Sequence, residues 1–327
     1  MEPDQPPSEQ ELVEAVTTLR AAYVPYAHLE RTKGRIKRLL LRNNAASEGA
    51  VYALIGPTRS GKSHLLRNLE DEYAREVTPN IMPNGDVAVR IPMLTVKVPD
   101  ASKKSLALAI YKALTNLDPE VTLGRKFNAE RVKDEIVRIA RECDLRLLVL
   151  DEAHQGIDNK SDREASEVAV FVEDLANEGR FSLLVAGTEN ALRLIRSNPE
   201  LAARSHKTLR LKPFQRTLRD LEVWYEVLDS LDLYLADKVF GGRSGLSEPR
   251  MAEALMTAAC GLIGHAATLI EIAATEALDD MLEGEPQPGI RWRHLENAFA
   301  EAAGRGTCKS FCTSVYAAIW RQPLANR

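Results

Sequence analysis

Short apolar runs alternate with longer amphipathic segments through the middle of this chain. Runs typical of buried strands lie at residues 51–55, within 87–98, and at 145–150, 181–186 and 209–211. Between them, apolar residues recur at helical spacing over 62–75, 105–114, 129–143 and 163–177. Strands that alternate with helices of this length predict a mostly parallel sheet with helices on both faces.

The regions on either side of this alternation have helical patterns only. Residues 11–42 are helical in pattern, with an interruption at Pro25. After Pro213, amphipathic helices are expected over 218–236, 248–260, 266–282 and 291–303. We therefore expect an N-terminal arm over 1–49 with a flexible tip, an α/β core over 50–215, a helical domain over 216–303 and a tail over 304–327.

Composition excludes several classes of protein. Of the 327 residues, 45% are hydrophobic and 28% are charged, which are ordinary values for a globular protein. The longest aliphatic run, 145–150, contains Arg146 and is far shorter than the ~20 apolar residues of a membrane span. The acidic, proline-rich start does not resemble a secretory signal, and four cysteines provide no disulfide framework. We expect a cytoplasmic protein without a membrane segment.

The charges are nearly balanced, which restricts contacts with nucleic acid to local patches. With 43 basic and 47 acidic residues the formal net charge is −4, so a surface that is basic all round is excluded. The most basic stretch, residues 31–42, has six basic residues and no acidic one. This stretch is a candidate for contact with nucleic acid or with a neighbouring subunit.

Residues 56–63, Gly-Pro-Thr-Arg-Ser-Gly-Lys-Ser, match the phosphate-binding loop GxxxxGK[ST]. The loop follows an apolar strand and opens a helix, which is the context that the motif requires. Glycines let backbone N–H groups surround phosphates, and the helix N-terminus adds partial positive charge. We expect Lys62 to reach the β- and γ-phosphates and Ser63 to bind Mg²⁺. The expected nucleotide-binding residues are Gly56, Pro57, Thr58, Arg59, Ser60, Gly61, Lys62, Ser63, His64 and Asp151.

A second motif consists of the apolar run 147–150 and the two carboxylates that follow it directly, Asp151 and Glu152. This is the Walker B arrangement, in which Asp151 holds Mg²⁺ and Glu152 polarises the attacking water. A solvent-exposed acidic pair at a strand end is the alternative, which the upstream phosphate loop disfavours. Together the two motifs predict an ATPase that uses Mg²⁺.

Two short motifs suggest other nucleotide-binding families. Residues 151–154 spell DEAH, the box of a helicase family, but that assignment needs a second RecA-like domain that the helical remainder does not supply. Residues 159–162 fit the guanine-reading NKxD pattern, but they lie in a polar loop and not at the end of a later strand. We interpret both matches as coincidence and favour adenine over guanine.

Two further polar residues occupy positions that carry chemistry in AAA+ ATPases. Thr188 follows the apolar run 181–186, at the place of the sensor 1 residue that contacts the γ-phosphate; capping of the next helix is the alternative. Arg204 stands where AAA+ proteins place an arginine finger, which neutralises transition-state charge in the neighbouring subunit's site. A surface ion pair is the alternative for Arg204.

Several stretches in this order resemble the TniB/TnsC family of AAA+ regulators of DNA transposition. The resemblance covers residues 20–280 and rests on YVPYAH, GPTRSGKSHLLR, IPMLTVKVPD, SLALAIYKAL, LLVLDEAH, LLVAGTENA and PELAARSHKTLRLKPF. It implies an AAA+ P-loop core with a helical lid. It also implies a site made of Lys62, Ser63, Asp151, Glu152 and Thr188 from one subunit and Arg204 from the next.

The resemblance also implies partners. Such proteins bind ATP and Mg²⁺ and assemble on double-stranded DNA as hexameric or heptameric rings or as helical filaments. They link a target selector of the TniQ type to a transposase of the TniA/TnsB type, and ATP hydrolysis drives disassembly. In relatives, the region that leads the helix after the second strand faces DNA, which makes Lys103 and Lys104 candidates for phosphate contacts. Lys160 and Arg163, just beyond Walker B, are further candidates, and solvated helix ends are the alternative for all four.

One feature departs from the common AAA+ pattern. Residues 261–269 contain no arginine where many lids have a sensor 2 arginine, and it stays open whether His265 takes its place. Slow hydrolysis would fit this absence. The aromatic residues Tyr23 and Tyr26 of the arm either stack near adenine or pack the arm on the core.

Three alternative functions stay open. The chain can be another AAA+ ATPase, either secretion-type or similar to a replication loader. It can also be a scaffold that binds ATP and hardly hydrolyses it.

Overall fold

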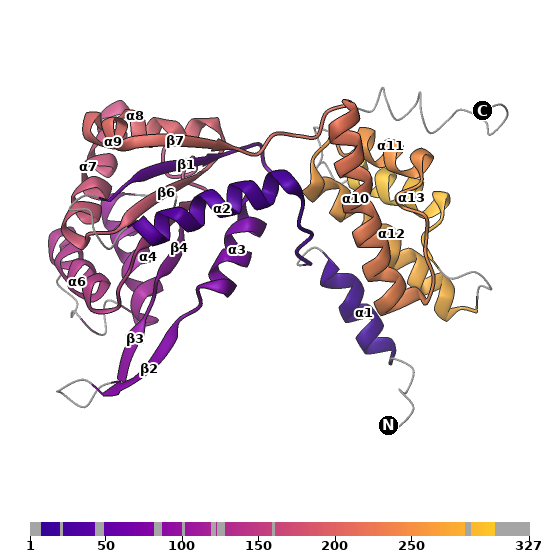
Figure 1. The fold of residues 1–327 in the computed structure, drawn as a ribbon, viewed down its shortest axis with the longest axis horizontal. Helices are drawn as coiled ribbons and strands as arrows, with labels where there is room; N and C mark the ends of the chain where they lie inside the picture. Colours follow the sequence, from indigo (N-terminus) through magenta and orange to yellow (C-terminus); the bar gives the residue numbers. More distant parts are fainter. Residues whose placement is uncertain are drawn as a thin grey trace. The chain divides into compact units, whose positions relative to one another are not determined.

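The computed structural model describes residues 8–19, 22–42, 49–81, 87–99, 102–118, 122, 128–158, 161–284 and 289–304. The chain divides into two compact units (Figure 1). The core unit consists of His28–Thr58 and Lys62–Lys212, and the helical unit of Met1–Ala27, Arg59–Gly61 and Pro213–Arg327. The tail expected over 304–327 lies outside the described residues except for Gly304.

The core unit alternates strands and helices, as the hydrophobic pattern predicts. Its elements in chain order are α2 (Ala27–Arg42), β1 (Val51–Ile55), α3 (Lys62–Glu72), β2 (Glu76–Ile81), β3 (Val87–Arg90), β4 (Met93–Lys97), α4 (Lys103–Thr115), α6 (Ala129–Glu142), β5 (Leu147–Asp151), α7 (Asp162–Gly179), β6 (Ser182–Gly187), the short helix η2 (Glu189–Ala191), α8 (Leu192–Arg196), α9 (Pro199–Arg204) and β7 (Ser205–Arg210). The predicted parallel α/β core is confirmed.

Five strands form one parallel sheet in the order β4-β5-β6-β1-β7. Strand β6 therefore lies between β1, which leads into the phosphate loop, and β5, which ends in the Walker B pair. In the register, Ile55 of β1 is opposite Gly187 of β6. Because all five strands run in the same direction, the segments that follow β1, β5 and β6 meet at one edge of the sheet.

One part of the predicted second strand has a different structure. The region 87–98 is interrupted at Pro92, and only its second half, β4, joins the sheet. Its first half, β3, pairs with β2 in a separate antiparallel hairpin that the sequence pattern did not indicate. Pro92 has no backbone N–H, so it cannot donate a ladder hydrogen bond at this point.

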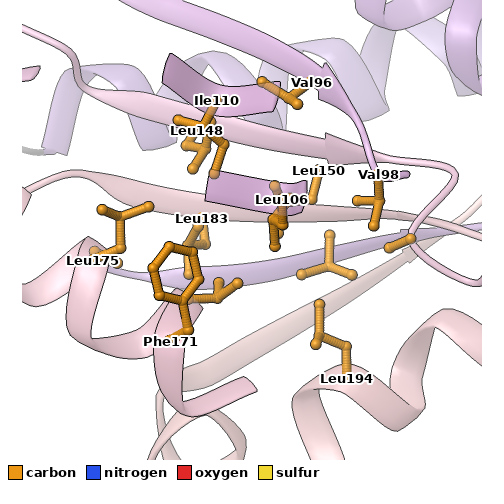
Figure 2. Close-up of a cluster of buried hydrophobic side chains, with 14 of the residues drawn as sticks. Val96, Val98, Leu106, Ile110, Leu148, Leu150, Phe171, Leu175, Leu183 and Leu194 are labelled. Carbon is orange, nitrogen blue, oxygen red and sulfur yellow. The ribbon is translucent and has the colours of Figure 1, made fainter. Parts of the chain in front are cut away.

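Apolar side chains fill the space between one face of the sheet and the helices that cover it. Figure 2 shows Leu148, Leu150 and Leu183 of the strands beside Leu106 of α4 and Phe171 of α7. These five side chains are at most 2% exposed. Burial of such side chains stabilises the core by about 1.5–3 kcal/mol each, and it holds the ends of β5 and β6 in place.

The helix α2, which was expected in the arm, belongs to the core unit. Within the described residues, the helical unit contains five α-helices and a π-turn. These are α1 (Glu9–Thr17), α10 (Leu218–Leu235), the π-turn η3 (Ala236–Phe240), α11 (Pro249–Ala258), α12 (Ile263–Leu282) and α13 (Trp292–Gly304). Trp224 of α10 is fully buried, and its Nε1–H donates to the carbonyl of Ala252 at 2.8 Å. Tyr234 of α10 donates to the carbonyl of Ala15 at 3.2 Å, which holds α1 in this unit.

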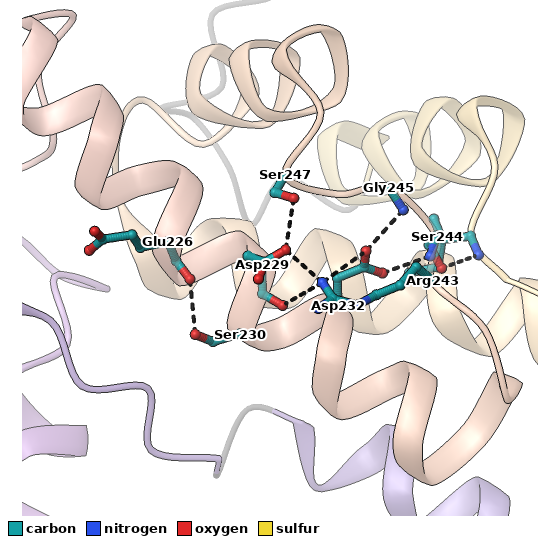
Figure 3. Close-up of polar contacts among 9 residues, drawn as sticks. Glu226, Asp229, Ser230, Asp232, Arg243, Ser244, Gly245 and Ser247 are labelled. Carbon is teal, nitrogen blue, oxygen red and sulfur yellow. Dashed lines mark hydrogen bonds and ion pairs between the residues drawn. The ribbon is translucent and has the colours of Figure 1, made fainter.

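A buried carboxylate organises the loop between α10 and α11. The two oxygens of Asp232 accept hydrogen bonds from the backbone N–H groups of Ser244 and Gly245, at 2.8 and 2.9 Å (Figure 3). Next to it, Asp229 accepts from the Arg243 guanidinium at 2.6 Å, and this bond lowers the pKa of Asp229. Each charge therefore has a partner, which accounts for a carboxylate in an apolar helical bundle.

Within the part of the chain that the structure describes, no single helix is long and apolar enough to cross a bilayer. The helices α11 and α12, which meet at a bend of 115°, have the length and composition of a membrane span only when they are counted together.

Candidate nucleotide-binding site

The phosphate loop connects β1 to α3 and is attached to the neighbouring strand. The N–H of Gly56 donates to the carbonyl of Gly187, the last residue of β6, at 3.1 Å. Two loop residues adopt positive φ, Arg59 at 67° and Gly61 at 93°. A glycine takes this conformation without strain, whereas Arg59 adopts it at a steric cost. Such strain is common where a backbone closely surrounds a ligand.

Lys62 lies inside this loop. Its side chain is buried, and Nζ donates to the carbonyls of Gly56 and Pro57, both at 2.8 Å. Burial lowers the pKa of Lys62, while the charges of Glu152 and Asp151 oppose that shift. The charges of both Walker B carboxylates thus act on the lysine ammonium group.

Ser63 of the phosphate loop and Asp151 of Walker B, the two residues that should hold a metal ion, meet directly. The Ser63 hydroxyl donates to Oδ2 of Asp151 at 2.9 Å, and Oδ1 of Asp151 accepts from the N–H of Glu152 at the same distance. A hydroxyl and a carboxylate are hard oxygen donors, which suit Mg²⁺. Among the described residues no cluster of three or more His, Cys, Asp or Glu forms a metal site. Mg²⁺ does not need one, because phosphates and waters usually complete its shell.

Glu152 begins a tight turn after β5. Its φ is +54°, a left-handed conformation that few side chains adopt. The turn is anchored because the N–H of Ala153 donates to the carbonyl of Ala186 on β6 at 2.9 Å. Oε2 of Glu152 lies 3.4 Å from Nε2 of His154. The sequence interpretation dismissed His154 as part of a chance DEAH match and missed this contact.

Thr188 follows β6 at the same edge of the sheet. It is the N-cap residue of η2, but its side chain makes no capping hydrogen bond. The capping alternative is therefore not realised by the hydroxyl. Because β6 lies between β1 and β5, Thr188 follows the strand between the two motifs. Its sensor 1 role stays a prediction.

Arg204, the last residue of α9, contacts its own subunit. Its guanidinium donates to Oε1 of Glu173 at 3.0 Å and also to Asn177, both on α7. Its side chain is 16% exposed, and Glu173 is buried. The structure thus places Arg204 in an ion pair within the chain, while its action on a neighbouring site stays a prediction.

The candidate DNA contacts lie at the starts of two helices. Lys103, at the start of α4, pairs with Glu130 at 2.5 Å, and Lys104 beside it is exposed. Arg163, near the start of α7, is 89% exposed and lies 3.3 Å from Glu167. Lys160 lies outside the described residues. The DNA-binding role of these residues stays a prediction.

Tyr26 and His265, both in the helical unit, were candidates for contact with the nucleotide. The ring of Tyr26 packs against Phe214 with centroids 5.3 Å apart, and burial raises the pKa of Tyr26 to about 12. This contact favours the packing role for Tyr26. His265 lies in the first turn of α12, where burial and the charge of Arg59 lower its pKa.

The chain is similar in fold to the ORC proteins of an archaeon, Aeropyrum pernix. It matches the ORC2 protein of Aeropyrum pernix, solved with ADPNP and ADP, with 18% identity and a TM-score of 0.56, over 86% of this chain and 71% of that one. It matches the ORC1 protein of the same organism, solved with DNA, with 16% identity and a TM-score of 0.56, over 88% and 69%.

A Walker-type ATPase of Pyrococcus abyssi is similar at 15% identity and a TM-score of 0.56, over 89% of this chain and 76% of that one. At these identities the likeness establishes the fold, which is that of the AAA+ ATPases with a helical C-terminal region. No curated protein matches the sequence. The family described as "Bacterial TniB protein" matches residues 17–216, more than half of the chain. The chain therefore belongs to the TniB family, as its motifs indicate.

Proposed function

We propose that this protein is an ATP-dependent regulator of DNA transposition that assembles on double-stranded DNA. It links a target selector of the TniQ type to a transposase of the TniA/TnsB type. One observation carries the proposal: in a TniB-family chain, Ser63 of the phosphate loop donates to Asp151 of the Walker B pair at 2.9 Å. These are the groups that nucleotide binding and hydrolysis need.

The site binds ATP through the loop between β1 and α3. Backbone N–H groups of residues 56–63 surround the phosphates, and Lys62 exchanges the carbonyls of Gly56 and Pro57 for phosphate oxygens. Ser63 and Asp151 hold Mg²⁺, which neutralises charge on the phosphates when it is bound. The Ser63–Asp151 hydrogen bond already brings these two oxygens together.

Hydrolysis depends on Glu152 and Thr188. The Glu152 carboxylate orients the attacking water and accepts its proton. The Thr188 hydroxyl, which makes no capping hydrogen bond, contacts the γ-phosphate. Arg204 of a neighbouring subunit completes the site in trans, so full activity requires an oligomer, either a ring of six or seven subunits or a helical filament.

DNA contact is electrostatic and independent of sequence. Lys103 and Lys104, with Lys160 and Arg163 as further candidates, neutralise backbone phosphates on the inner surface of the assembly. Binding of ATP favours the assembled state, and hydrolysis favours its disassembly. This cycle limits the time for which an insertion site is marked.

A second candidate function is a switch that binds ATP and scarcely hydrolyses it. The absence of arginine from residues 261–269 favours it, because His265 there has a lowered pKa and carries less positive charge than an arginine at neutral pH. Both candidates require nucleotide-dependent assembly. They differ in the rate of turnover.

The deciding experiment measures binding to a fluorescent DNA duplex with ATP, a slowly hydrolysed analogue, ADP and no nucleotide. Electron microscopy of the same mixtures shows whether rings or filaments form. We expect binding and assembly with ATP and the analogue, and loss of both with ADP. Absence of duplex binding in every nucleotide state at low salt would contradict the DNA role.

A further inference from the structure

His154 lies in the turn that carries Glu152 and is held there by the backbone. Its carbonyl accepts hydrogen bonds from the N–H groups of Ile157 and Asp158, at 3.0 and 2.9 Å. The next residue but one, Gly156, packs so closely on Val98 that a Cβ would come within 2.5 Å of a Val98 methyl. The turn is therefore fixed against β4 and its extension, and the imidazole has a defined place.

The two ring nitrogens of His154 have different surroundings. Nε2 lies 3.4 Å from Oε2 of Glu152. Nδ1 is buried and has no hydrogen-bond partner within the described part of the chain. A Cβ built on Gly187 would lie 3.1 Å from Nδ1, so this nitrogen faces the end of β6.

These surroundings favour one tautomer of the neutral ring. A proton on Nδ1 would bury an unsatisfied donor and turn the Nε2 lone pair toward a carboxylate. A proton on Nε2 places the donor near Oε2 of Glu152 and leaves the buried Nδ1 as an acceptor. The Nε2–H tautomer is therefore the favoured one, and it places a donor nitrogen 3.4 Å from the catalytic carboxylate.

The same strand end also contacts the phosphate loop. Gly187 lies beside Nδ1 of His154, and its carbonyl accepts a hydrogen bond from the N–H of Gly56 at 3.1 Å. His154 thus lies between the catalytic carboxylate and the strand that anchors the phosphate loop. Among the described residues, the Lys62 ammonium donates to Gly56 and Pro57 and the Ser63 hydroxyl donates to Asp151, and neither hydrogen-bonds to His154.

We propose that His154 is a positioning residue for ATP hydrolysis, which holds Oε2 of Glu152 so that the other carboxylate oxygen faces the attacking water. The inference rests on the proposed ATPase function. Because His154 acts through Glu152 and not on the phosphates, it affects the rate of hydrolysis and not the affinity for ATP. The DEAH sequence then has a local role that is independent of the helicase family.

The test uses two variants of the full chain with similar side-chain volume. His154→Gln keeps an N–H donor near the place of Nε2, and His154→Met removes it. We expect His154→Met to lower kcat about 10-fold, as loss of orientation does, with the dissociation constant of fluorescent ATP unchanged. His154→Gln restores kcat to within about threefold of the wild type. Gln155→Ala, an exposed residue of the same turn, is the matched control and leaves kcat unchanged.

A double mutant separates positioning from a general structural effect. In a Glu152→Gln background, His154→Met causes no further loss of the residual rate, because the carboxylate on which it acts is absent. Equal kcat values for His154→Met, His154→Gln and the wild type would overturn this inference and leave the proposed ATPase function standing. Equal loss with both variants, or an additive loss in the double mutant, would also overturn it. A wild type no faster than Lys62→Ala would overturn the proposed hydrolysis itself.

Discussion

The guanidinium of Arg204 lies 3.0 Å from Oε1 of Glu173, so the candidate arginine finger is held by a buried carboxylate of its own subunit. This pair joins the end of α9 to the middle of α7. A residue that acts on a neighbouring subunit would have to leave or share this partner. The pair therefore has consequences for stability and for assembly, which can be measured separately.

Removal of Arg204 should destabilise the folded chain. Arg204→Ala leaves Glu173 buried without its cation, and we expect a loss of about 3 kcal/mol in the free energy of unfolding, measured with urea. Adding Glu173→Gln to Arg204→Ala should recover most of that loss, because no charge then remains buried. Arg163→Ala, which breaks an exposed pair, is the control and should change stability by less than about 0.5 kcal/mol. A loss in the control as large as that in Arg204→Ala would contradict this account.

If Arg204 acts in trans, two inactive variants should complement each other. Arg204→Ala retains its own phosphate loop and Walker B pair, and Glu152→Gln, which should still assemble, retains its arginine. Each alone should lose turnover by about 10³-fold or more, the scale of an arginine finger. A mixture of the two on duplex DNA should regain measurable phosphate release. A mixture that stays as inactive as its components, although both assemble, would exclude a composite site.

Nucleotide binding and hydrolysis should have opposite effects on the lifetime of the assembly. Lys62→Ala removes the cation for the phosphates and should abolish ATP-dependent assembly on DNA. Glu152→Gln keeps the binding groups and should leave assembly intact with slower disassembly. Light scattering after ATP is depleted measures both. Normal assembly of Lys62→Ala would contradict the nucleotide switch.

The salt dependence of DNA binding identifies phosphate contacts. If Lys103 and Lys104 each neutralise one phosphate, the double alanine variant should reduce the slope of log K against log salt by about 2. The loss should be similar for duplexes of different sequence. Arg138→Ala on α6, an exposed arginine paired with Glu135 and Glu142, is the control. An unchanged slope would assign the lysines to ordinary solvated helix ends.

Alkaline pH should destabilise the wild type through Tyr26. Burial raises the pKa of Tyr26 from 10.0 to about 12, so the folded state favours the protonated phenol. The stability gained is complete below pH 10 and is lost as pH rises through about 12. The difference in unfolding free energy between wild type and Tyr26→Phe should therefore change by about 2–3 kcal/mol over this range. A constant difference would show that the phenol is accessible to water.

Much of the candidate site follows from local sequence. A phosphate loop needs its glycines, Lys62 and Ser63 at fixed spacing between a strand and a helix, and all of these are neighbours in the chain. The Walker B pair likewise follows from an apolar run that ends in two carboxylates. The helices that follow Pro213 were predicted within a few residues, because the 3.6-residue period is a local signal.

The sequence by itself determined the parallel α/β core, the helical domain and the residues of both nucleotide motifs. Tertiary structure alone decided that β6 lies between β1 and β5, that β2 and β3 form a separate hairpin, and that His154 and Arg204 contact Glu152 and Glu173. Strand order and side-chain partners depend on contacts between distant residues. A buried parallel strand has the same apolar pattern whichever strand lies beside it, so the pattern does not specify its neighbours.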